Sequence, residues 1–448
     1  MIVFSRVDAP RALTLKILRK VSDGAWADSL LRHFLDRSDW ERRDKTFVTE
    51  LVMGTLRYRL RLDHMLTYVS HQPLKKLDPP VLEILRMSAY QILFTRVPAY
   101  AACDSAVELA RDAGFKRASG FINAVLRNLN RKADEVVFPD PKRWPVDWLS
   151  IYESHPRWLV ARWVERFGFR GAHQLCVANN RPAPVVVRAN RLKTDATRLR
   201  RDLKTFGIEA EPTRYAPDGL VFRSGGSPIG TALYQEGRYS IQGEAAQLAV
   251  SAADIRPGMH LLDACAGRGG KSTYFAERLS NSGWILAIDV HPERLAQLDA
   301  ECRRLGVTNV TPRVQDARDS VPETFDIVFV DAPCSATGIV GRVPDARWHK
   351  KPEDIARLVV LQGEILRSVA KRVRVGGMLL YSTCSLESEE NEQQVSAFLR
   401  EHPGFFSEPP ESFPDDAGHP EGIGATLLPH IHQTDGFYTA SLKRVNSA

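Results

Sequence analysis

From residue 260 onward, short apolar runs alternate regularly with helical stretches along this chain of 448 residues. The apolar runs read HLLDA, WILAIDV, NVTPRV, FDIVFVDA and GMLLYSTC, and ERLAQLDAECRRLG is one of the helical stretches between them. Strands that alternate with helices form a parallel sheet, because each crossover helix carries the chain back to the start of the next strand. The pattern predicts a doubly wound, mostly parallel α/β sheet.

Residues 8–132 follow a different pattern, because their apolar residues recur at three- and four-residue spacing. Pro79-Pro80 and Gly114 fall between the periodic stretches, as helix breakers should, so this part is predicted to be a compact all-α unit. Over residues 1–140, Lys and Arg number 23 against 17 Asp and Glu, so this part carries +6 of the chain's net charge of +7. The excess favours a polyanionic partner, although an ordinary solvated basic surface would give the same charge.

The segment between the two patterns reads FPDPKRWPVDW, residues 138–148, and its three prolines and lack of periodicity are typical of a linker. A small α/β segment follows, with VVVRAN and GLVFRSG as strands and DATRLRRDLKTFG as a helix. We therefore predict three parts: an all-α domain over residues 1–137, the linker and small α/β segment over 138–235, and an α/β catalytic domain over 236–448.

Two classes of protein are disfavoured by the composition. No apolar run approaches the roughly 20 residues that span a bilayer, and the N-terminus does not resemble a signal peptide, so we expect a cytoplasmic protein without membrane association. The six cysteines include no C-x-x-C pair, which predicts free thiols and no metal site. Nothing in the sequence suggests an obligate oligomer, and we expect a monomer.

The first strand of the regular part runs into DACAGRGGKST, residues 263–273. Gly267, Gly269 and Gly270 permit a tight turn and a close approach of the backbone to a ligand at a helix N-terminus. The next strand ends in Asp289, where a carboxylate can accept both hydroxyls of a ribose. Asp316 follows the third strand, where the adenine amino group would lie. Together these features favour an adenosine-containing cofactor.

The spacing of the glycines selects among such cofactors. A dinucleotide-binding loop reads G-x-G-x-x-G and a P-loop reads G-x-x-x-x-G-K-[ST], whereas this loop reads G-x-G-G with Lys271 following. We therefore predict S-adenosylmethionine rather than NAD or ATP.

Two cysteines follow the ends of neighbouring strands of the predicted sheet. Asp331 and Cys334 lie just past the fourth strand, in FVDAPCSATG, and Cys384 follows the fifth, in YSTCS. Ligands of open α/β sheets bind at the carboxyl ends of the strands, so both thiols are placed beside the predicted cofactor. The other three cysteines outside the glycine loop are interpreted as small core residues: Cys103, Cys176 and Cys302.

Methylation of carbon 5 of a pyrimidine needs both a methyl donor and a thiol. A thiolate that adds to carbon 6 turns the ring into an enamine, and carbon 5 can then attack the methyl group. Asp331 would hydrogen-bond the ring nitrogen 3 or the exocyclic amine of a cytosine, and a second thiol fits the release step. On this chemistry either cysteine could be the nucleophile. We also expect a helix just after Cys384, with Glu387, Glu389 and Glu390 in its first turns.

DAPCSATG and YSTCSLESEENE resemble the two signature motifs of the Nop2/Sun/RsmB family of RNA cytosine-5 methyltransferases. DACAGRGGKS is similar to the family's cofactor loop, and HPRWLV with PVVVRANRLK to the segment before its catalytic core. Residues 8–132 resemble the NusB-type helical RNA-binding domain of the RsmB branch. The resemblance covers most of the chain, and it implies methylation of cytosine in RNA, with small-subunit ribosomal RNA as the substrate.

The resemblance also implies roles for individual residues. It implies that Cys384 is the nucleophile and that Cys334 assists release of the methylated product. DNA cytosine-5 methyltransferases would instead use the cysteine at the Cys334 position as the nucleophile. The cofactor would be held by the residues of the glycine loop and by three carboxylates: Cys265, Ala266, Gly267, Arg268, Gly269, Gly270, Lys271, Asp289, Asp316 and Asp331.

The chain departs from the family pattern in three segments. Gly267 and Arg268 replace the usual Ala-Pro of the loop, and Ala336 stands where glycine is usual. IQGEAAQ, residues 241–247, replaces the customary VQDxxSQ, so that an acid is lost at Gly243.

Two other functions compete with this one. The chain could be a non-catalytic RNA-binding or assembly factor whose catalytic half has decayed, but Cys334, Cys384 and Asp331 are all retained. A nicotinamide oxidoreductase is disfavoured by the glycine spacing.

Overall fold

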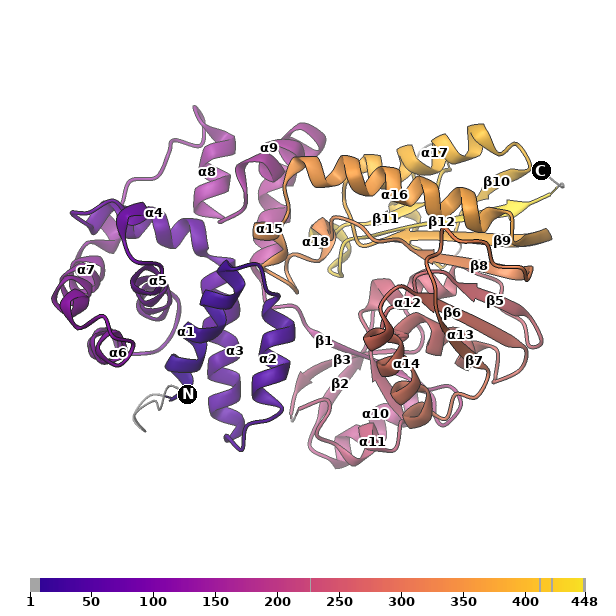
Figure 1. The fold of residues 1–448 in the computed structure, drawn as a ribbon, viewed down its shortest axis with the longest axis horizontal. Helices are drawn as coiled ribbons and strands as arrows, with labels where there is room; N and C mark the ends of the chain where they lie inside the picture. The colour runs from indigo at the N-terminus through magenta and orange to yellow at the C-terminus, as the bar shows by residue number, and fades with distance from the viewer. Residues whose placement is uncertain (1–8, 226, 411, 420–421, 446–448) are drawn as a thin grey trace. The chain divides into compact units, whose positions relative to one another are not determined.

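The computed structural model describes residues 9–225, 227–410, 412–419 and 422–445 (Figure 1). The chain forms two compact units, each built from two stretches of sequence. The helical unit comprises Met1–Arg181 and Val340–Lys350, and the α/β unit comprises Pro182–Ile339 and Lys351–Ala448. Within the described ranges, no helix combines the length and apolar character needed to cross a membrane.

The helices predicted for the first part are confirmed. The helical unit contains α1 (Ala9–Ser22), α2 (Ala27–Leu35), α3 (Arg42–Arg57), α4 (Arg59–Val69), α5 (Pro79–Phe94), α6 (Ala99–Asp112), α7 (Ser119–Lys132), α8 (Pro145–Tyr152), α9 (Arg157–Asn180) and α15 (Ala346–His349). Three short 3-10 helices, Leu74–Lys76, Lys116–Ala118 and Ala133–Glu135, lie between them.

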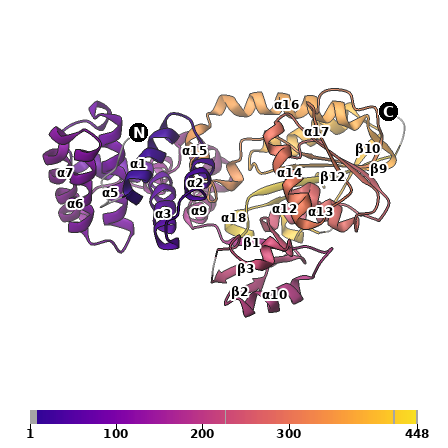
Figure 2. The same ribbon diagram turned by 60° about the horizontal axis from the view of Figure 1, so that its bottom comes forward.

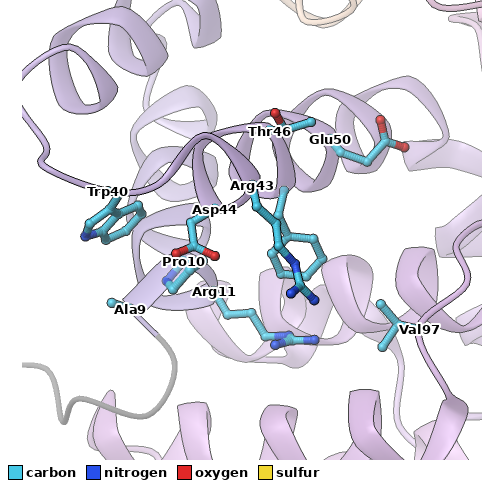
Figure 3. Close-up of a pocket in the computed structure, with 10 residues that line it drawn as sticks. Ala9, Pro10, Arg11, Trp40, Arg43, Asp44, Thr46, Glu50 and Val97 are labelled. Carbon is cyan, nitrogen blue, oxygen red and sulfur yellow. The ribbon is translucent and has the colours of Figure 1, made fainter. Parts of the chain in front are cut away.

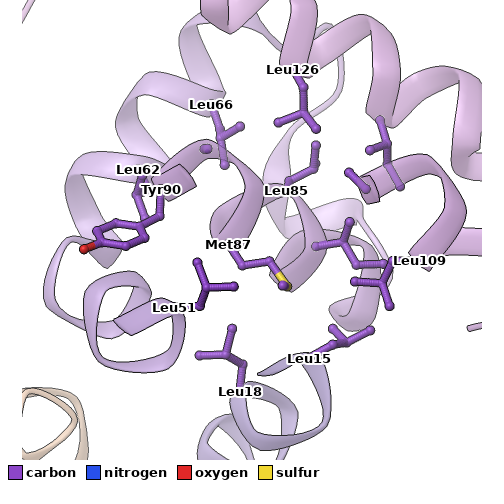
Figure 4. Close-up of a cluster of buried hydrophobic side chains, with 14 of the residues drawn as sticks. Leu15, Leu18, Leu51, Leu62, Leu66, Leu85, Met87, Tyr90, Leu109 and Leu126 are labelled. Carbon is purple, nitrogen blue, oxygen red and sulfur yellow. The ribbon is translucent and has the colours of Figure 1, made fainter. Parts of the chain in front are cut away.

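Helix α5 lies at the centre of the apolar core of the helical unit (Figure 4). Its Leu85 and Met87 are fully buried, and they pack within one cluster with Leu18 from α1 and Leu51 from α3. The helix starts with Pro79 and Pro80, whose fixed φ suits the first turn, where the backbone N–H has no partner inside the helix.

The predicted linker is shorter than expected. Helix α8 begins at Pro145, so only the first residues of the 138–148 segment lack helical structure. Proline interrupts a helix at interior positions but is accepted at the first position of a helix. The sequence pattern alone does not show which of these positions a proline occupies. The compact helical unit continues to Arg181, and our three-part division at residues 137 and 235 stays a prediction.

The segment Val340–Lys350 belongs to the helical unit although it follows the Cys334 motif in the chain. The Arg347 side chain is fully buried there and donates hydrogen bonds to the backbone oxygens of Ser154 (3.0 Å) and Asn179 (3.3 Å) and to Oδ1 of Asn180 (3.1 Å). Asp345 Oδ2 accepts the backbone N–H of Ala27 (2.8 Å). Polar side chains therefore hold this segment against α2, α9 and the loop before α9.

The α/β unit contains a small antiparallel sheet, whose strands follow the order β2-β3-β1-β4. The strands are β1 (Val185–Ala189), β2 (Glu209–Pro212), β3 (Gly219–Ser224) and β4 (Tyr239–Ile241), with α10 (Ala196–Thr205) and α11 (Ala232–Gln235). Both Figure 1 and Figure 2 show α10 beside this sheet. The strands and helix predicted here are confirmed.

The main sheet has the order β10-β12-β9-β8-β5-β6-β7, and β11 pairs with β12. Its strands are β5 (His260–Asp263), β6 (Trp284–Asp289), β7 (Val310–Val314), β8 (Phe325–Asp331), β9 (Val373–Thr383), β10 (Phe405–Glu408), β11 (Ala425–Leu427) and β12 (Phe437–Arg444). The five strands from β9 to β7 pair in parallel, whereas β12 pairs antiparallel with β9. The predicted doubly wound, mostly parallel sheet is confirmed.

Helices cover both faces of this sheet. They are α12 (Glu244–Ser251), α13 (Gly270–Arg278), α14 (Pro292–Leu305), α16 (Pro352–Ala370), α17 (Glu392–Glu401) and α18 (Pro429–His432), with short 3-10 helices at Thr337–Ile339, Ser388–Glu390 and Asp415–Ala417. Leu262 faces a cluster that includes residues of α16 and α17, and its neighbour Leu261 faces a cluster that includes residues of α13. Because both faces are buried, the strands read as continuous apolar runs.

Candidate active site

The glycine loop connects β5 to α13 and bends where glycine is needed. Gly267 and Gly269 have φ of 55° and 82°, in the left-handed region that glycine adopts without strain. A Cβ on Gly269 would lie 2.1 Å from Cδ1 of Leu298, whereas a Cβ on Gly267 would meet nothing within 4 Å. The loop therefore packs closely against α14 at Gly269 and borders open space at Gly267.

Arg188 of β1 supports this loop from within the α/β unit. Its guanidinium is fully buried and forms an ion pair with Glu277 of α13 (2.5 Å). It also donates to the backbone oxygen of Gly270 (2.8 Å) and to Oε1 of Gln242 (2.5 Å). Sequence reasoning assigned neither Arg188 nor Gln242 to the site, because a strand arginine and a loop glutamine have no distinctive spacing.

Four carboxylates gather around the start of the loop. The pKa of the Cys265 thiol is raised well above its ordinary value, first by burial and then by the charges of the four, which are Asp263, Asp331, Asp289 and Asp316. Burial raises the pKa of Asp263 to about 7, although the Ser272 hydroxyl donates to it (2.6 Å). Oδ1 of Asp263 is buried and has no hydrogen-bond partner among the described residues. This concentration of negative charge suits a cationic ligand.

Asp289 and Asp316 occupy the positions predicted from the sequence: Asp289 ends β6 and Asp316 follows β7. Oδ2 of Asp289 accepts the backbone N–H of Gly267 (2.9 Å), and its Oδ1 accepts that of His291 (2.9 Å). Asp289 therefore lies beside the glycine loop and also holds its backbone in place. Asp316 is held by Arg318 (2.7 Å), and this hydrogen bond lowers the pKa of the Asp316 carboxyl.

Lys271 and Asp331 form an ion pair at the end of β8, with 2.5 Å between Nζ and Oδ2. Ser382 donates a hydrogen bond to the other oxygen of Asp331 (3.3 Å). Burial alone would lower the pKa of Lys271, but the Asp331 carboxylate outweighs it and raises the pKa, and Cys384 contributes in the same direction. The ammonium group of Lys271 therefore acts electrostatically on both Asp331 and Cys384.

The two thiols predicted at neighbouring strand ends lie together. Cys334 follows β8 and Cys384 follows β9, and their sulfur atoms are 3.3 Å apart. The contact with Cys384, together with burial, raises the pKa of Cys334 well above its ordinary value. Cys334 therefore keeps its proton, which leaves it able to donate toward Cys384.

A buried carboxylate holds the two cysteine loops in place. Glu390 has no exposed surface, and it accepts hydrogen bonds from the Ser335 backbone N–H (2.9 Å), the Ser385 hydroxyl (2.5 Å) and the Gln362 side chain (3.0 Å). Ser335 and Ser385 each follow one of the cysteines, so one carboxylate sets the position of both. Sequence reasoning missed this role, since an acidic run is ordinarily solvated.

The helix expected just after Cys384 was a wrong prediction. Ser388–Glu390 is a short 3-10 helix, and α17 begins only at Glu392. The inward turn of Glu390 and the non-helical backbone of Asn391 (φ −115°, ψ −109°) separate the thiol from the helix. The N-terminus of α17 therefore does not lie directly after Cys384, and the cation that interacts with this cysteine is Lys271 of α13.

The departures from the family pattern have local consequences. Ala336 has φ of 59°, so an alanine occupies a left-handed position that glycine would occupy without strain. Gly243 is the residue before α12, and no side-chain hydrogen bond caps that helix. Arg268 is exposed, whereas Ala266, two residues earlier, is buried. The loop thus keeps its bend at Gly267 without the proline.

Comparison with known proteins places this site in a family. A family model described as 16S rRNA methyltransferase RsmB/F matches residues 250–443, one described as NusB family matches 8–131, and one described as Methyltr_RsmF/B-like, ferredoxin-like domain matches 155–227. The chain is 35% identical to the Probable ribosomal RNA small subunit methyltransferase B of Bacillus subtilis, over 97% of this chain and 98% of that protein. It is 34% identical to the Ribosomal RNA small subunit methyltransferase B of Pseudomonas putida, with 98% of both chains covered. The crystal structure of PH0851 matches with a TM-score of 0.82 and 26% identity, over 97% of this chain and 99% of that one.

Proposed function

We propose, from the premise that this chain belongs to the 16S rRNA methyltransferase RsmB/F family, that it methylates carbon 5 of a cytosine in 16S ribosomal RNA through a covalent bond to Cys384. The observation that carries the proposal is the pair of thiols 3.3 Å apart at the ends of β8 and β9, beside an acid-lined glycine loop. S-adenosylmethionine is the methyl donor of this family, and the predicted cofactor agrees with it.

The residues of the loop fit this cofactor. S-adenosylmethionine carries a sulfonium and an ammonium group, and the four carboxylates around Cys265 supply the complementary charge. The phosphates of a dinucleotide or of ATP would instead meet the like charge of those carboxylates. Asp289 would accept the ribose hydroxyls, Asp316 would lie toward the adenine, and the residues from Cys265 to Lys271 would line the methionine end. When bound, the cofactor supplies an electrophilic methyl group.

Cys384 begins the reaction by adding its thiolate to carbon 6 of the cytosine. The electrons of the 5,6 double bond move onto carbon 5, which makes that atom nucleophilic. Asp331 holds the base through nitrogen 3 or the exocyclic amine. Carbon 5 would then attack the methyl group, whose bond to the sulfonium sulfur would break and leave a neutral thioether.

Release reverses the addition. A base removes the hydrogen from carbon 5, the double bond re-forms, and the bond between carbon 6 and the Cys384 sulfur breaks. Cys334 retains its proton at neutral pH and touches the departing sulfur, so it is placed to stabilise Cys384 as the thiolate leaves. These roles assign Cys384 to attack and Cys334 to release.

The test measures transfer of labelled methyl from S-adenosylmethionine to protein-free 16S ribosomal RNA, followed by nucleoside digestion. Wild type should place label in 5-methylcytosine, and Cys384→Ala should reduce it to background while retaining cofactor binding. Cys334→Ala should leave RNA covalently attached to the protein on a denaturing gel. Cys302→Ala is the matched control, since this thiol lies on α14 outside the site.

Two results would contradict the assignment. If Cys384→Ala still transfers methyl groups, another group is the nucleophile. If an RNA adduct persists in the double variant Cys334→Ala/Cys384→Ala, the trapped bond does not involve Cys384.

We further propose that the protein acts as a monomer in the cytoplasm. Each cysteine of the site and each carboxylate of the loop comes from one chain, so no second copy is needed to complete the chemistry. Light scattering after size-exclusion chromatography would contradict this if the active fraction had twice the mass of the chain.

A further inference from the structure

A hollow of about 740 Å³ opens on the helical unit between the start of α1 and the first turns of α3 (Figure 3). Trp40, which precedes α3, and Val97, which precedes α6, complete its wall. None of the chemistry described for the α/β unit uses this hollow. Its lining includes two aromatic rings, two arginines and two carboxylates.

Two guanidinium groups reach into the middle of the hollow. Arg11 of α1 and Arg43 of α3 both line it, and Figure 3 shows their side chains directed toward the same region. The Arg11 side chain is fixed, because it donates to Oε1 of Gln91 (2.8 Å) and lies 5.0 Å from the ring centroid of Phe47. Arg43 is exposed and has no side-chain partner among the described residues. Two converging guanidinium groups bind a phosphate well, through short charge-assisted hydrogen bonds.

The neighbouring end of the hollow offers a ring and a carboxylate. Trp40 is half-buried against the core, and no described aromatic ring stacks on its indole. Asp44, on the first turn of α3, receives no hydrogen bond to its carboxylate from any described residue. The other carboxylate, Glu50, already accepts the hydroxyl of Tyr90. Asp44 is therefore the acceptor that remains available to a ligand.

A carboxylate beside a stacking ring distinguishes among the four RNA bases. Guanine presents two adjacent donors, N1–H and the N2 amine, which one carboxylate accepts together. Adenine and cytosine present one amine beside an acceptor nitrogen, which repels a carboxylate, and uracil presents a single N–H between two carbonyls. An indole face stacks on any base, so it supplies affinity without selecting among them.

We propose that this hollow binds one unpaired guanosine nucleotide of the RNA substrate. The base stacks on Trp40 and donates to Asp44, and the phosphate is bound by Arg11 and Arg43. This inference rests on the proposed function only in taking RNA as the substrate. Under this proposal, the hollow is a site at which the basic first part of the chain contacts RNA.

The test compares two short uridine-rich single-stranded RNAs that differ only in one central residue, guanosine or adenosine. Binding to the full-length protein is measured by fluorescence anisotropy. Wild type should bind the guanosine RNA roughly tenfold more tightly, the size of one good bidentate base contact. Inosine at that position lacks the N2 amine and should give an intermediate affinity.

Variants separate the two halves of the hollow. Asp44→Asn should remove the preference for guanosine. Arg43→Gln should weaken both RNAs and reduce the slope of log affinity against log salt by about 0.7, as one lost phosphate contact does on a single strand. Lys75→Gln is the matched control: it removes one charge from an exposed side chain of the same unit outside the hollow, and it should retain the preference.

Equal affinity of wild type for the two RNAs, or a preference that survives Asp44→Asn, would overturn the inference. Methyl transfer to 16S ribosomal RNA is measured on the same samples, so that a failure of this inference can be distinguished from a failure of the proposed function. Transfer without a preference for guanosine rejects only the hollow, and a preference without transfer rejects only the catalytic proposal.

Discussion

Among the described residues, each unit contains one completely buried arginine, and the two are stabilised in different ways. Arg188 in the α/β unit pairs with the carboxylate of Glu277 at 2.5 Å. Arg347 in the helical unit donates to backbone oxygens and to Asn180, with no carboxylate of the described residues within ion-pair distance. Burial lowers the pKa of Arg347 to about 9, and the neighbouring charge of Arg57 adds to the effect.

The difference shows what each charge does for its unit. The Arg188–Glu277 pair joins two elements around the cofactor loop, and its free energy depends on keeping both members. Arg347 instead gathers carbonyl groups at the ends of helices and loops, including those of Ser154 and Asn179. Carbonyl dipoles compensate a buried charge less completely than a carboxylate, so the Arg347 contact organises chain segments without contributing comparable stability.

The largest effect is expected for Arg188→Met. This change leaves Glu277 buried without its partner, and it should lower the free energy of unfolding by about 3–5 kcal/mol. Burial already raises the pKa of Glu277, and loss of Arg188 raises it further. A group whose pKa is raised on folding loses stability as pH rises, so the destabilisation should be greater at pH 8 than at pH 5. Urea unfolding at the two pH values measures it.

The double variant Arg188→Met/Glu277→Leu sharpens this result. Removal of both charges should recover much of the lost stability, because no unpaired carboxylate remains. If the double variant is as unstable as Arg188→Met, packing around the loop and not the charge accounts for the loss.

A smaller effect is expected for Arg347→Met. The change leaves several carbonyl groups without a donor, at a cost of about 1–3 kcal/mol, but it also removes a poorly compensated charge. Urea unfolding should therefore show less destabilisation than for Arg188→Met, and proteolysis within residues 340–350 should become faster. Equal destabilisation by the two variants would mean that carbonyl groups compensate the charge as well as a carboxylate does.

The smallest effect is expected for Arg223→Ala. Arg223 and Glu211 form an ion pair at 2.7 Å on the small sheet, with 57% and 55% of their side chains exposed. Water screens such a pair, so its removal should change the free energy of unfolding by less than about 1 kcal/mol. A larger change would show that the surface of the small sheet is more strongly coupled to its core than exposure indicates.

The features that could be predicted from the sequence are those that depend on hydrophobic periodicity and on where each strand ends. Cys334 and Cys384 lie together because β8 and β9 are parallel neighbours, so that residues just past their ends meet at one edge. Asp289 reaches the glycine loop for the same reason. Such positions follow from the order of elements along the chain, and the alternation of strands and helices displays that order directly.

Contacts that join distant segments could not be predicted in this way. Glu390 belongs to a run of acids that a local rule places at a helix start, but the buried serines beside both cysteines turn it inward. Arg347 lies in a segment with no strong pattern, and apart from the Asn180 side chain its acceptors are backbone oxygens, including those of residues 57, 154 and 179. Backbone acceptors leave no trace in the sequence, since every residue carries one.

The return of the chain at Val340–Lys350 means that the gene encodes the helical unit in two separate places. A fragment that stopped at Arg181 would lack α15, and with it the acceptor for the Ala27 N–H and the indole donor to Leu56. A transplant of the whole helical unit would therefore have to carry the second stretch as well, and a fragment truncated at Arg181 would lose these two contacts.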